Sequence, residues 1–272
     1  MKKSLAALLA VILLLSLSAC AKKTKLEEIQ SRGTLVVYTD PNFSPFEFIG
    51  GNEEVVGVDI EIAKAIAAEL GVKIEIKQSD FDGLVLSLKG GRGDVVISGM
   101  TIREDRRENV DFSVPYIDSV QYLILPEGSE ITVLEDLAGK NVGVAIGYTG
   151  QFLLEDELHE KVNEDEDDAD GVLARTGTVV NQYKSALDAT LDLKAGRIQA
   201  VVMDEYVAKN IVANNSGITT IPLNYADGSP VSEEYGVAVP KGNEAFVEKI
   251  NTVIARLIAE GRIAEWVVQF SS

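Results

Sequence analysis

The sequence predicts an α/β protein built as two lobes. Strand-like runs of β-branched residues alternate with helix-like runs whose apolar residues recur at four-residue spacing, a pattern typical of layered α/β folds. The 272 residues are too many for one minimal domain and suit one large domain or two of moderate size. Residues 88–97 and 193–202 each read as a helix end, a glycine turn and a buried strand, which favours two lobes of related construction. A chance similarity between two such turns is the alternative.

Local patterns give the individual elements in order. Runs of β-branched and other aliphatic residues predict strands at 35–39, 72–76, 94–98, 141–146, 176–180, 198–203, 218–223 and 235–239. Apolar residues at helical spacing predict helices at 60–70, 84–88, 150–161, 182–195, 205–213 and 246–260. We expect Asp59 to cap the first of these helices and Gly71 to end it, while Gly261 ends the last one.

The composition excludes several classes of function. Lys and Arg number 25 against 43 Asp and Glu, which gives a formal net charge of −18. Nucleic-acid binding needs a cationic face for the phosphates, so no nucleic-acid partner is expected. One Cys excludes an internal disulfide, and one His excludes a metal site built from several histidines. We expect neither a metal ion nor a cofactor.

The amino terminus has the pattern of a secretory signal peptide. Lys2 and Lys3 precede an apolar run at 5–17, and small residues follow it, so we expect residues 1–19 to be removed on export. The run is shorter than the ~20 residues of a membrane span, although an uncleaved anchor helix is the alternative. LSAC at 17–20 also resembles the bacterial lipobox, which implies a lipid such as palmitate on Cys20. Residues 20–33 would then form a tether, and the protein would lie outside the cytoplasm, anchored to the cell membrane.

The segment 163–170 is a run of acidic residues with the sequence NEDEDDAD. Glu166, Asp168 and Asp170 match the first half of a calcium-binding loop. The twelfth position of that loop is Gly177, however, where a bidentate Glu is needed. We therefore expect a solvated loop without a metal ion, and we attach no function to it.

Four polar residues follow the ends of predicted strands in the two halves of the chain. They are Asp40, Ser98, Thr149 and Asp204. Ligands of open α/β sheets bind at the carboxyl ends of the strands. Each residue alone is an ordinary cap or turn residue, but their recurrence predicts two sheet edges that face each other across a cleft.

The segment 101–104 has the form of a capping box, which predicts a helix amino terminus directly after the strand that ends at Ser98. The free backbone donors and the helix dipole make such a terminus an anion site. Arg106, about one turn further on, adds a guanidinium that suits a carboxylate. We interpret Arg103 and Arg107 as solvated helix charges.

Asp204 in the other half of the chain supplies the opposite charge and can accept hydrogen bonds from an ammonium group. A guanidinium at Arg106 and a carboxylate at Asp204 describe a receptor for a zwitterion, since each buried ligand charge needs a partner. The lone His159 lies among acidic residues on a polar helix, so we expect a solvated residue rather than a general acid or base.

A series of short motifs runs through the chain. They are DPNFSPFEF at 40–48, GVDIE at 57–61, SGMT at 98–101 with Arg106, VDFS at 110–113, GYTG at 147–150, Met203-Asp204 and YGVAVPKG at 235–242. Together they resemble the extracytoplasmic solute-binding proteins of polar amino-acid ABC importers, family 3, over essentially the whole mature chain. The resemblance implies a periplasmic-binding-protein-like (type II) fold, with hinge crossovers near 117–121 and 224–234. Lobe 1 would comprise 34–117 plus 234–272, and lobe 2 would comprise 121–224.

The resemblance also implies roles for residues of the cleft. The α-carboxylate of the ligand would be held by Arg106, Thr101 and Thr149. Its α-amino group would be held by Asp204 and by the backbone around Ser98 and Gly99.

The pocket for the ligand side chain would be lined by Asp40, Phe43 and Val58. The chain departs from the family pattern at two positions, because Val58 stands where an aromatic residue is common and Tyr148 where a small residue is usual. Asp40 and the strongly acidic composition favour a basic or amide side chain over an acidic one. Arginine, lysine, histidine and glutamine all stay open, and so does cystine.

These expectations describe capture of a ligand without chemistry, and not an enzyme. The protein would bind a free amino acid outside the cell and deliver it to the membrane permease of an ABC importer, and we expect it to be a monomer. Two alternatives remain open from the sequence alone. One is a sensory module that reports the ligand to a receptor, and the other is a dehydratase-like enzyme on the same fold.

Overall fold

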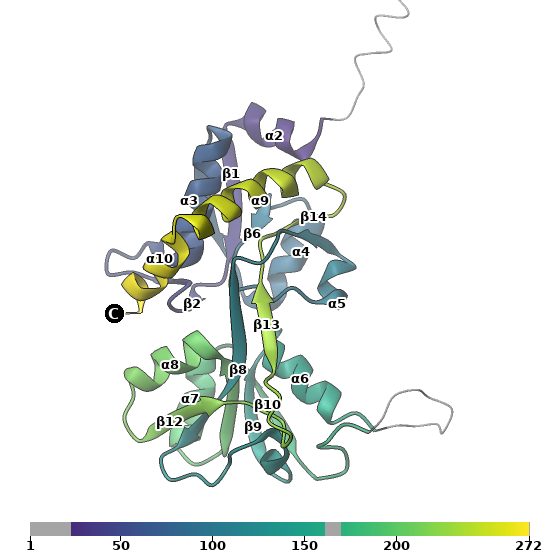
Figure 1. Ribbon diagram of the computed structural model, residues 1–272, viewed down its shortest axis with the longest axis vertical. Coiled ribbons are helices and arrows are strands. Elements are labelled where there is room, and N and C mark those ends of the chain that lie inside the picture. The colour runs from purple at the N-terminus through teal and green to yellow at the C-terminus, as the bar shows by residue number, and fades with distance from the viewer. Residues whose placement is uncertain (1–22, 161–169, 272) are drawn as a thin grey trace, which may run out of the picture.

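The computed structural model describes residues 23–160 and 170–271. The predicted signal peptide, Cys20 and residues 163–169 of the acidic run lie outside the described residues. Figure 1 shows two lobes stacked along the long axis, each containing a sheet with helices against it, so the predicted two-lobe α/β fold is confirmed. In the described part of the chain, no helix combines the length and the hydropathy that crossing a bilayer requires.

Lobe 1 is built on a sheet with the strand order β5-β1-β6-β14-β7. β1 (Thr34–Thr39) pairs in parallel with β5 (Lys73–Gln78) and β6 (Val95–Val96), whereas β14 (Ala238–Pro240) runs antiparallel to β6 and β7 (Val110–Phe112). A small antiparallel sheet contains β2 (Asn42–Phe43), β3 (Glu47–Ile49) and β4 (Val55–Val56). The helices are α2 (Lys25–Arg32), α3 (Val58–Leu70), α4 (Leu84–Lys89), α5 (Glu104–Arg107), α9 (Glu244–Ala259) and α10 (Arg262–Phe270), with the short 3-10 helix η2 (Phe81–Gly83).

Lobe 2 is built on a second sheet with the order β10-β9-β11-β8-β12. β9 (Asn141–Ala145) pairs in parallel with β10 (Val179–Tyr183) and β11 (Ala200–Asp204). The long strand β8 (Ile117–Pro126) runs antiparallel to β11 and to β12 (Ile218–Pro222). The helices are α6 (Thr149–Glu157), α7 (Ala186–Lys194) and α8 (Glu205–Ala213), with the 3-10 helix η3 (Leu134–Leu137).

Two antiparallel strands carry the chain between the lobes. β8 begins beside β13 (Ser232–Tyr235), with Ile117 opposite Tyr235 and Val120 opposite Ser232, and then enters the sheet of lobe 2. Figure 1 shows both strands at the waist of the molecule. Because Gln121 and Glu233 on these strands are buried, the crossing brings polar side chains between the lobes.

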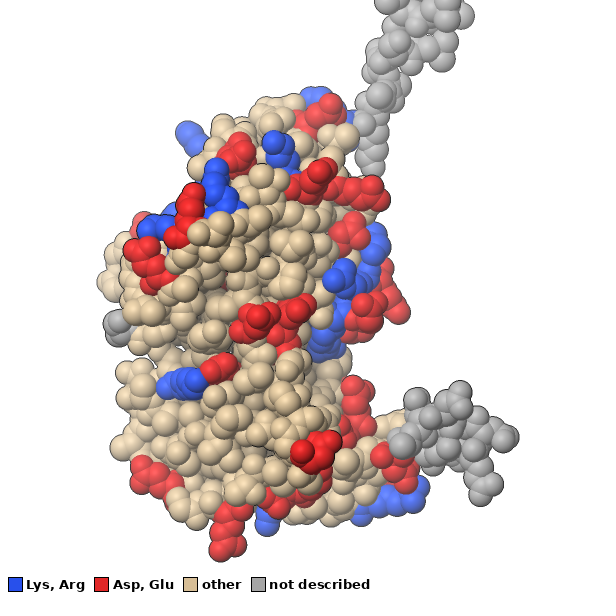
Figure 2. Space-filling view, viewed as in Figure 1, with Lys and Arg blue, Asp and Glu red and all other residues tan. Residues whose placement is uncertain are grey.

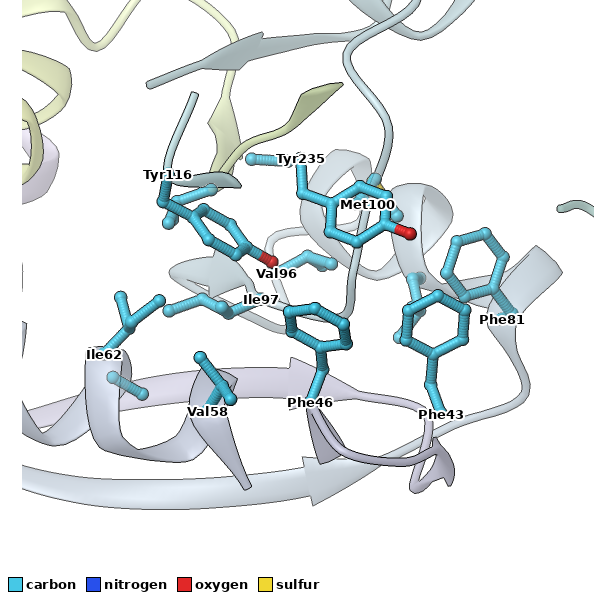
Figure 3. Close-up of a cluster of buried hydrophobic side chains, with 14 of the residues drawn as sticks. Phe43, Phe46, Val58, Ile62, Phe81, Val96, Ile97, Met100, Tyr116 and Tyr235 are labelled. Carbon is cyan, nitrogen blue, oxygen red and sulfur yellow. The ribbon is translucent and has the colours of Figure 1, made fainter. Parts of the chain in front are cut away.

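The periodic apolar residues form the core. On α9, Phe246, Ile250 and Ile254 recur every four residues and are buried, and burial of each stabilises the fold by about 1.5–3 kcal/mol. Figure 3 shows the part of the core where Val58 and Ile62 of α3 lie close to Phe46, Ile97 and Tyr116. A separate cluster that includes Leu123, Leu134 and Val142 forms the core of lobe 2.

Gly71 ends α3 as predicted, but both predicted amino-terminal caps are wrong. α3 begins after Gly57, whose φ is 129° and where a Cβ would lie 2.1 Å from the Phe46 carbonyl oxygen. Asp59 lies inside the helix, and its carboxylate accepts a hydrogen bond from the Gly99 N–H at 2.7 Å. After Thr101, α5 begins only at Glu104 and has no side-chain cap. The Thr101 hydroxyl instead donates to the buried carboxyl group of Glu233, and it does not cap the N–H groups at the start of α5.

Other differences lie at boundaries and in short elements. The strand expected at 235–239 is divided, because Tyr235 ends the crossing strand β13 whereas Ala238 begins β14 in the sheet of lobe 1. β10 extends to Tyr183 along β9, so α7 begins at Ala186 rather than at 182. The sequence patterns did not predict β2, β3, β4, β7, β8, α2 or α10.

Candidate functional site

The predicted strand-end residues meet between the lobes. Asp40 follows β1 and Ser98 lies just after β6 in lobe 1, while Asp204 ends β11 and Thr149 begins α6 in lobe 2. Asp40, Ser98 and Asp204 are buried, and Thr149 is partly buried. Two sheet edges therefore face each other, as the recurrence of these residues predicts.

Arg106 on α5 connects the two lobes. Its Nη1 donates to the Thr101 carbonyl of its own lobe and its Nη2 donates to the Gly147 carbonyl of lobe 2, both at 2.8 Å. The residue is only 7% exposed. Burial, with the nearby charge of Arg103, lowers the pKa of Arg106 to about 10, so the guanidinium stays charged at neutral pH. A buried positive charge is thus presented between the lobes.

The prediction that Arg103 is a solvated helix charge is wrong. Its guanidinium lies 3.6 Å from the centroid of the Phe152 ring on α6 of the other lobe, and only 15% of the side chain is exposed. It also donates from Nε and Nη2 to the Asp105 carboxylate at 2.9 and 2.8 Å. Stacking on an aromatic face favours burial of a guanidinium, which is only weakly hydrated. Arg107 has an exposed side chain and pairs with Glu104.

Two threonine hydroxyls also meet across the lobes. Thr101 Oγ1 and Thr149 Oγ1 lie 2.7 Å apart, and Thr101 donates to Glu233 Oε2 at 2.8 Å. Gln121 Nε2 then donates to Glu233 Oε1 at 2.9 Å and to Asp204 Oδ1 at 2.6 Å. We call this network the polar half of the site; it comprises Thr101, Arg106, Gln121, Thr149, Asp204 and Glu233.

The two buried carboxyl groups of the polar half influence each other. Burial and the neighbouring Asp204 raise the pKa of Glu233 to about 8, and burial also raises the pKa of Asp204. Tyr235 OH donates to Asp204 Oδ2 at 2.8 Å and stabilises the ionised form of that group. The carboxyl pair therefore keeps a proton near neutral pH, which avoids two like charges in one buried site.

Two further buried acids, Glu47 and Asp59, hold the loop at 98–99 of lobe 1 in place. Ser98 Oγ accepts from the Asp40 N–H at 3.0 Å and donates to Glu47 Oε1 at 2.7 Å. Asp59 accepts from Gly99 N–H, as described above, and from Tyr116 OH at 3.0 Å. Burial raises the pKa of Asp59 to about 6 and the pKa of Glu47 well above its usual range. These bonds fix the loop at 98–99.

Next to this loop lie aromatic rings from both lobes. Tyr148 of lobe 2 stacks on Phe81 with ring centroids 4.1 Å apart, and its centroid lies 5.6 Å from that of Phe43. Figure 3 shows Phe43 and Phe81 at the same end of the buried cluster. Burial raises the pKa of Asp40, whose Oδ2 accepts from Tyr148 OH at 3.2 Å. We call Asp40, Phe43, Phe81 and Tyr148 the aromatic half of the site.

The remaining sequence-based assignments are placed as follows. Gly99 has a φ of 48°, and a Cβ there would lie 2.2 Å from the Phe43 ring, so the loop approaches that ring as only glycine permits. Val58 is fully buried at the start of α3, on the Ile62 side of the cluster in Figure 3. His159 is exposed beyond α6.

Sequence reasoning missed several residues of the site: Glu47, Phe81, Gln121, Glu233 and Tyr235. Gln121 and Glu233 lie on the crossing strands, where no local pattern distinguishes a buried polar residue from a solvated one. Phe81 lies between Asp80 and Asp82, and an aromatic residue in such an acidic loop is a signal that could have been used.

The chain as a whole is acidic. Figure 2 shows acidic side chains, together with basic ones, beside the groove where the lobes meet on this face. With a formal net charge of −18 for the whole chain, the field favours the approach of cations and disfavours anions. The contact between the lobes thus brings together a buried guanidinium, buried carboxyl groups and aromatic faces.

Comparison with known proteins gives consistent matches. The family model described as bacterial extracellular solute-binding proteins, family 3, matches residues 35–271. The L-cystine-binding protein TcyJ of Escherichia coli (strain K12) is 31% identical over 267 residues, which cover 96% of this chain and 92% of that protein.

Solved structures with similar folds include two arginine complexes. The arginine-bound form of truncated ArgBP from T. maritima has a TM-score of 0.71 and 39% identity, covering 85% of this chain and 99% of that one. An amino acid ABC transporter substrate-binding protein from Streptococcus pneumoniae Canada MDR_19A, bound to L-arginine, has a TM-score of 0.78 and 29% identity. That match covers 92% of this chain and 98% of the other.

Proposed function

Because the chain belongs to family 3 of the bacterial extracellular solute-binding proteins, we propose that it binds a free amino acid between its lobes and delivers it to the permease of an ABC importer. The observation that carries the proposal is the buried guanidinium of Arg106, which lies in the same interlobe network as Asp204 and Glu233. A zwitterion has one group for each of these opposite charges.

The α-carboxylate of the ligand binds Arg106 and the hydroxyls of Thr101 and Thr149. Arg106 now donates to two carbonyl oxygens, one of them that of Gly147. A ligand carboxylate replaces such neutral acceptors by a charged one, and each charge-assisted hydrogen bond contributes about 1.5–3 kcal/mol.

The α-amino group binds Asp204, together with the backbone around Ser98 and Gly99. Glu233 lies beside Asp204 and shares Gln121 with it as a donor. The ammonium group of the ligand favours the ionised form of both carboxyl groups. Its positive charge therefore replaces the proton that the buried pair otherwise keeps.

The side chain of the ligand is basic or an amide, and arginine is the first to test. Asp40 offers a carboxylate, and Phe43 and Phe81 offer aromatic faces beside it. A planar guanidinium uses both, because it stacks on rings and donates to carboxylates at the same time. The proteins to which this chain is similar include some named for arginine, cystine and histidine.

Ligand binding stabilises the arrangement in which the lobes meet. We assign lobe 1 to 34–117 plus 234–272, against which α2 packs through the buried Ile29. We assign lobe 2 to 121–224, with hinges near 117–121 and 224–234. A ligand that contacts both lobes shifts the population towards the closed form by its differential affinity, and this form docks on the permease. The protein acts as a monomer outside the cytoplasm, with the signal peptide 1–19 removed and a lipid on Cys20.

The experiment that tests the function is calorimetric titration of the exported protein. The ligands are L-arginine, L-lysine, L-histidine, L-glutamine, L-cystine and agmatine, which is arginine without its α-carboxylate. We expect at least one amino acid to bind with a dissociation constant of about 1 μM or less, and agmatine to bind at least about a hundredfold more weakly than arginine. Absence of binding by every amino acid, or equal binding of agmatine and arginine, contradicts the proposal.

A further inference from the structure

Tyr148 lies in the part of the site that the proposed function gives to the ligand side chain. It comes from lobe 2, directly before α6, yet its ring contacts two rings of lobe 1. The planes of Tyr148 and Phe81 are only 26° apart at a centroid distance of 4.1 Å, which is a stacked geometry. The ring of Phe43 lies 5.6 Å away at 34°. A lobe 2 side chain thus covers the aromatic faces of lobe 1.

The hydroxyl of Tyr148 reaches the only carboxylate of the aromatic half. It donates to Asp40 Oδ2 at 3.2 Å, while Asn42 Nδ2 donates to Oδ1 at 2.6 Å. Asp40 is 2% exposed and Tyr148 is 4% exposed, so both groups are withdrawn from solvent. Both oxygens of Asp40 therefore have a donor from the protein itself.

We propose that Tyr148 is a specificity-determining residue that competes with the ligand side chain for Phe81 and Asp40. The proposal rests on the proposed function, since it concerns the side-chain pocket of the same site. A long basic side chain needs one aromatic face and one carboxylate, and these are the two contacts that Tyr148 makes. Such a side chain binds only by displacing the ring. It succeeds because it brings a charged donor to the Asp40 carboxylate, whereas the phenol is a neutral donor.

The backbone on both sides of Tyr148 is held by the polar half. The Gly147 carbonyl accepts from Arg106, and the Thr149 hydroxyl lies 2.7 Å from that of Thr101. Gly147 itself has a φ of 82°, and a Cβ there would lie 3.3 Å from the Asp82 backbone. Displacement of Tyr148 is therefore a rotation of its side chain that leaves the polar half in place. Ligands whose side chains do not reach Asp40 leave the ring where it is.

The test compares L-arginine with L-alanine on three proteins: wild type, Tyr148→Ala and Tyr148→Phe. Removal of the competing ring should tighten arginine binding by about tenfold and change alanine binding by less than about threefold. Tyr148→Phe keeps the ring but loses the bond to Asp40, so arginine should bind about threefold more tightly. Tyr225→Phe is the matched control, because this lobe 2 tyrosine donates to Glu157 away from the site, and its arginine affinity should equal that of wild type.

The outcomes separate this inference from the proposed function. Arginine binding that is unchanged or weaker in the Tyr148 variants overturns the competition, because the ring would then be a wall of the pocket. If Tyr148→Ala does not fold, which its thermal melting curve reveals, Tyr148→Phe decides alone by the same criterion. If no variant and no wild-type protein binds any amino acid, the proposed function fails and this inference fails with it. Binding that depends on Arg106 but is not tightened by the Tyr148 substitutions leaves the function standing and removes only the competition.

Discussion

The polar half and the aromatic half of the site join the same two lobes by different means. In the polar half, Arg106 and Thr101 meet lobe 2 through hydrogen bonds to Gly147 and Thr149. In the aromatic half, the lobes meet through the stack of Tyr148 on Phe81, with one hydrogen bond to Asp40. Hydrogen bonds are directional and strengthen when one partner is charged, whereas ring stacking responds to shape.

This difference teaches how affinity and selectivity are divided in the site. On the proposed function, the polar half binds the two groups that every amino acid carries, so substitutions there should weaken all amino acids together. The aromatic half is proposed to contact only the side chain, so substitutions there should change the ratio between ligands. The predictions of ligand binding below test this division.

The largest effect is expected for Arg106→Ala. Removing a buried charge partner leaves the ligand carboxylate unpaired, which costs about 3–5 kcal/mol, or two to three and a half decades of affinity. Calorimetry should show the same loss for arginine, glutamine and any other amino acid that wild type binds. Arg107→Ala on the same helix is the matched control, since its side chain is exposed, and it should leave affinity unchanged. A loss below tenfold removes Arg106 from the site.

Asp40→Asn should act on the other half and should depend on the ligand. The carboxylate is lost while the shape is kept, so a cationic side chain loses a charge-assisted bond of about 1.5–3 kcal/mol. Arginine and lysine should bind about ten- to a hundredfold more weakly, whereas glutamine should change by less than about threefold. Titration of the three ligands measures the ratio directly. Equal weakening of glutamine and arginine would place Asp40 in a general supporting role and break the division.

The polar residues at the strand ends could be predicted because their signals are local. Asp40 follows a strand in which buried and partly buried residues alternate, and Asp204 ends a strand of buried residues. In both cases the position of the strand end is visible in the sequence pattern. The hydrogen-bond partners of these residues could not be predicted from the sequence. Gln121 and Glu233 meet because β8 and β13 cross side by side, and such a pairing depends on contacts between distant parts of the chain.

The capping box shows the same limit in a local motif. Residues 101–104 satisfy the pattern, yet the Thr101 hydroxyl bonds to Glu233 and α5 begins at Glu104. The residues around Arg103 in the sequence give no sign that it is buried, but Phe152 of lobe 2 lies against it. In both cases a partner from the opposite lobe or the crossing strand decides the conformation, and no spacing within the segment reveals that partner.

The pH dependence of binding sharpens the account of the polar half. Because the pKa of Glu233 is raised to about 8, the group is protonated at pH 6, and a ligand ammonium must expel this proton. Affinity should rise by up to about tenfold for each pH unit between 6 and 8. Calorimetry in buffers of different ionisation enthalpy measures the released proton, and Glu233→Gln should remove most of the slope. A flat profile in wild type contradicts this role.

The same group should make folding less favourable as the pH rises. The folded protein binds the proton of Glu233 more tightly than the unfolded chain does, so the free energy of unfolding should fall between about pH 4.5 and pH 8. The raised pKa of Asp59, about 6, adds a decrease of the same sign that ends nearer pH 6. Urea unfolding at pH 5 and pH 8 measures the difference, and Glu233→Gln should reduce it.

The smallest effect is expected where an aromatic contact supports the polar half. Arg103 lies over Phe152 across the lobes, and such a cation–π contact contributes about 0.5–1 kcal/mol. Phe152→Leu keeps an apolar side chain but loses the ring face, so all amino acids should bind about two- to fivefold more weakly. Arg103→Leu and the double variant complete a cycle in which the second substitution should cost little once the first is made. Phe152→Leu could instead change the ratio of the arginine affinity to the glutamine affinity. Aromatic contacts would then set selectivity in the polar half too, and the two halves would not divide affinity from selectivity.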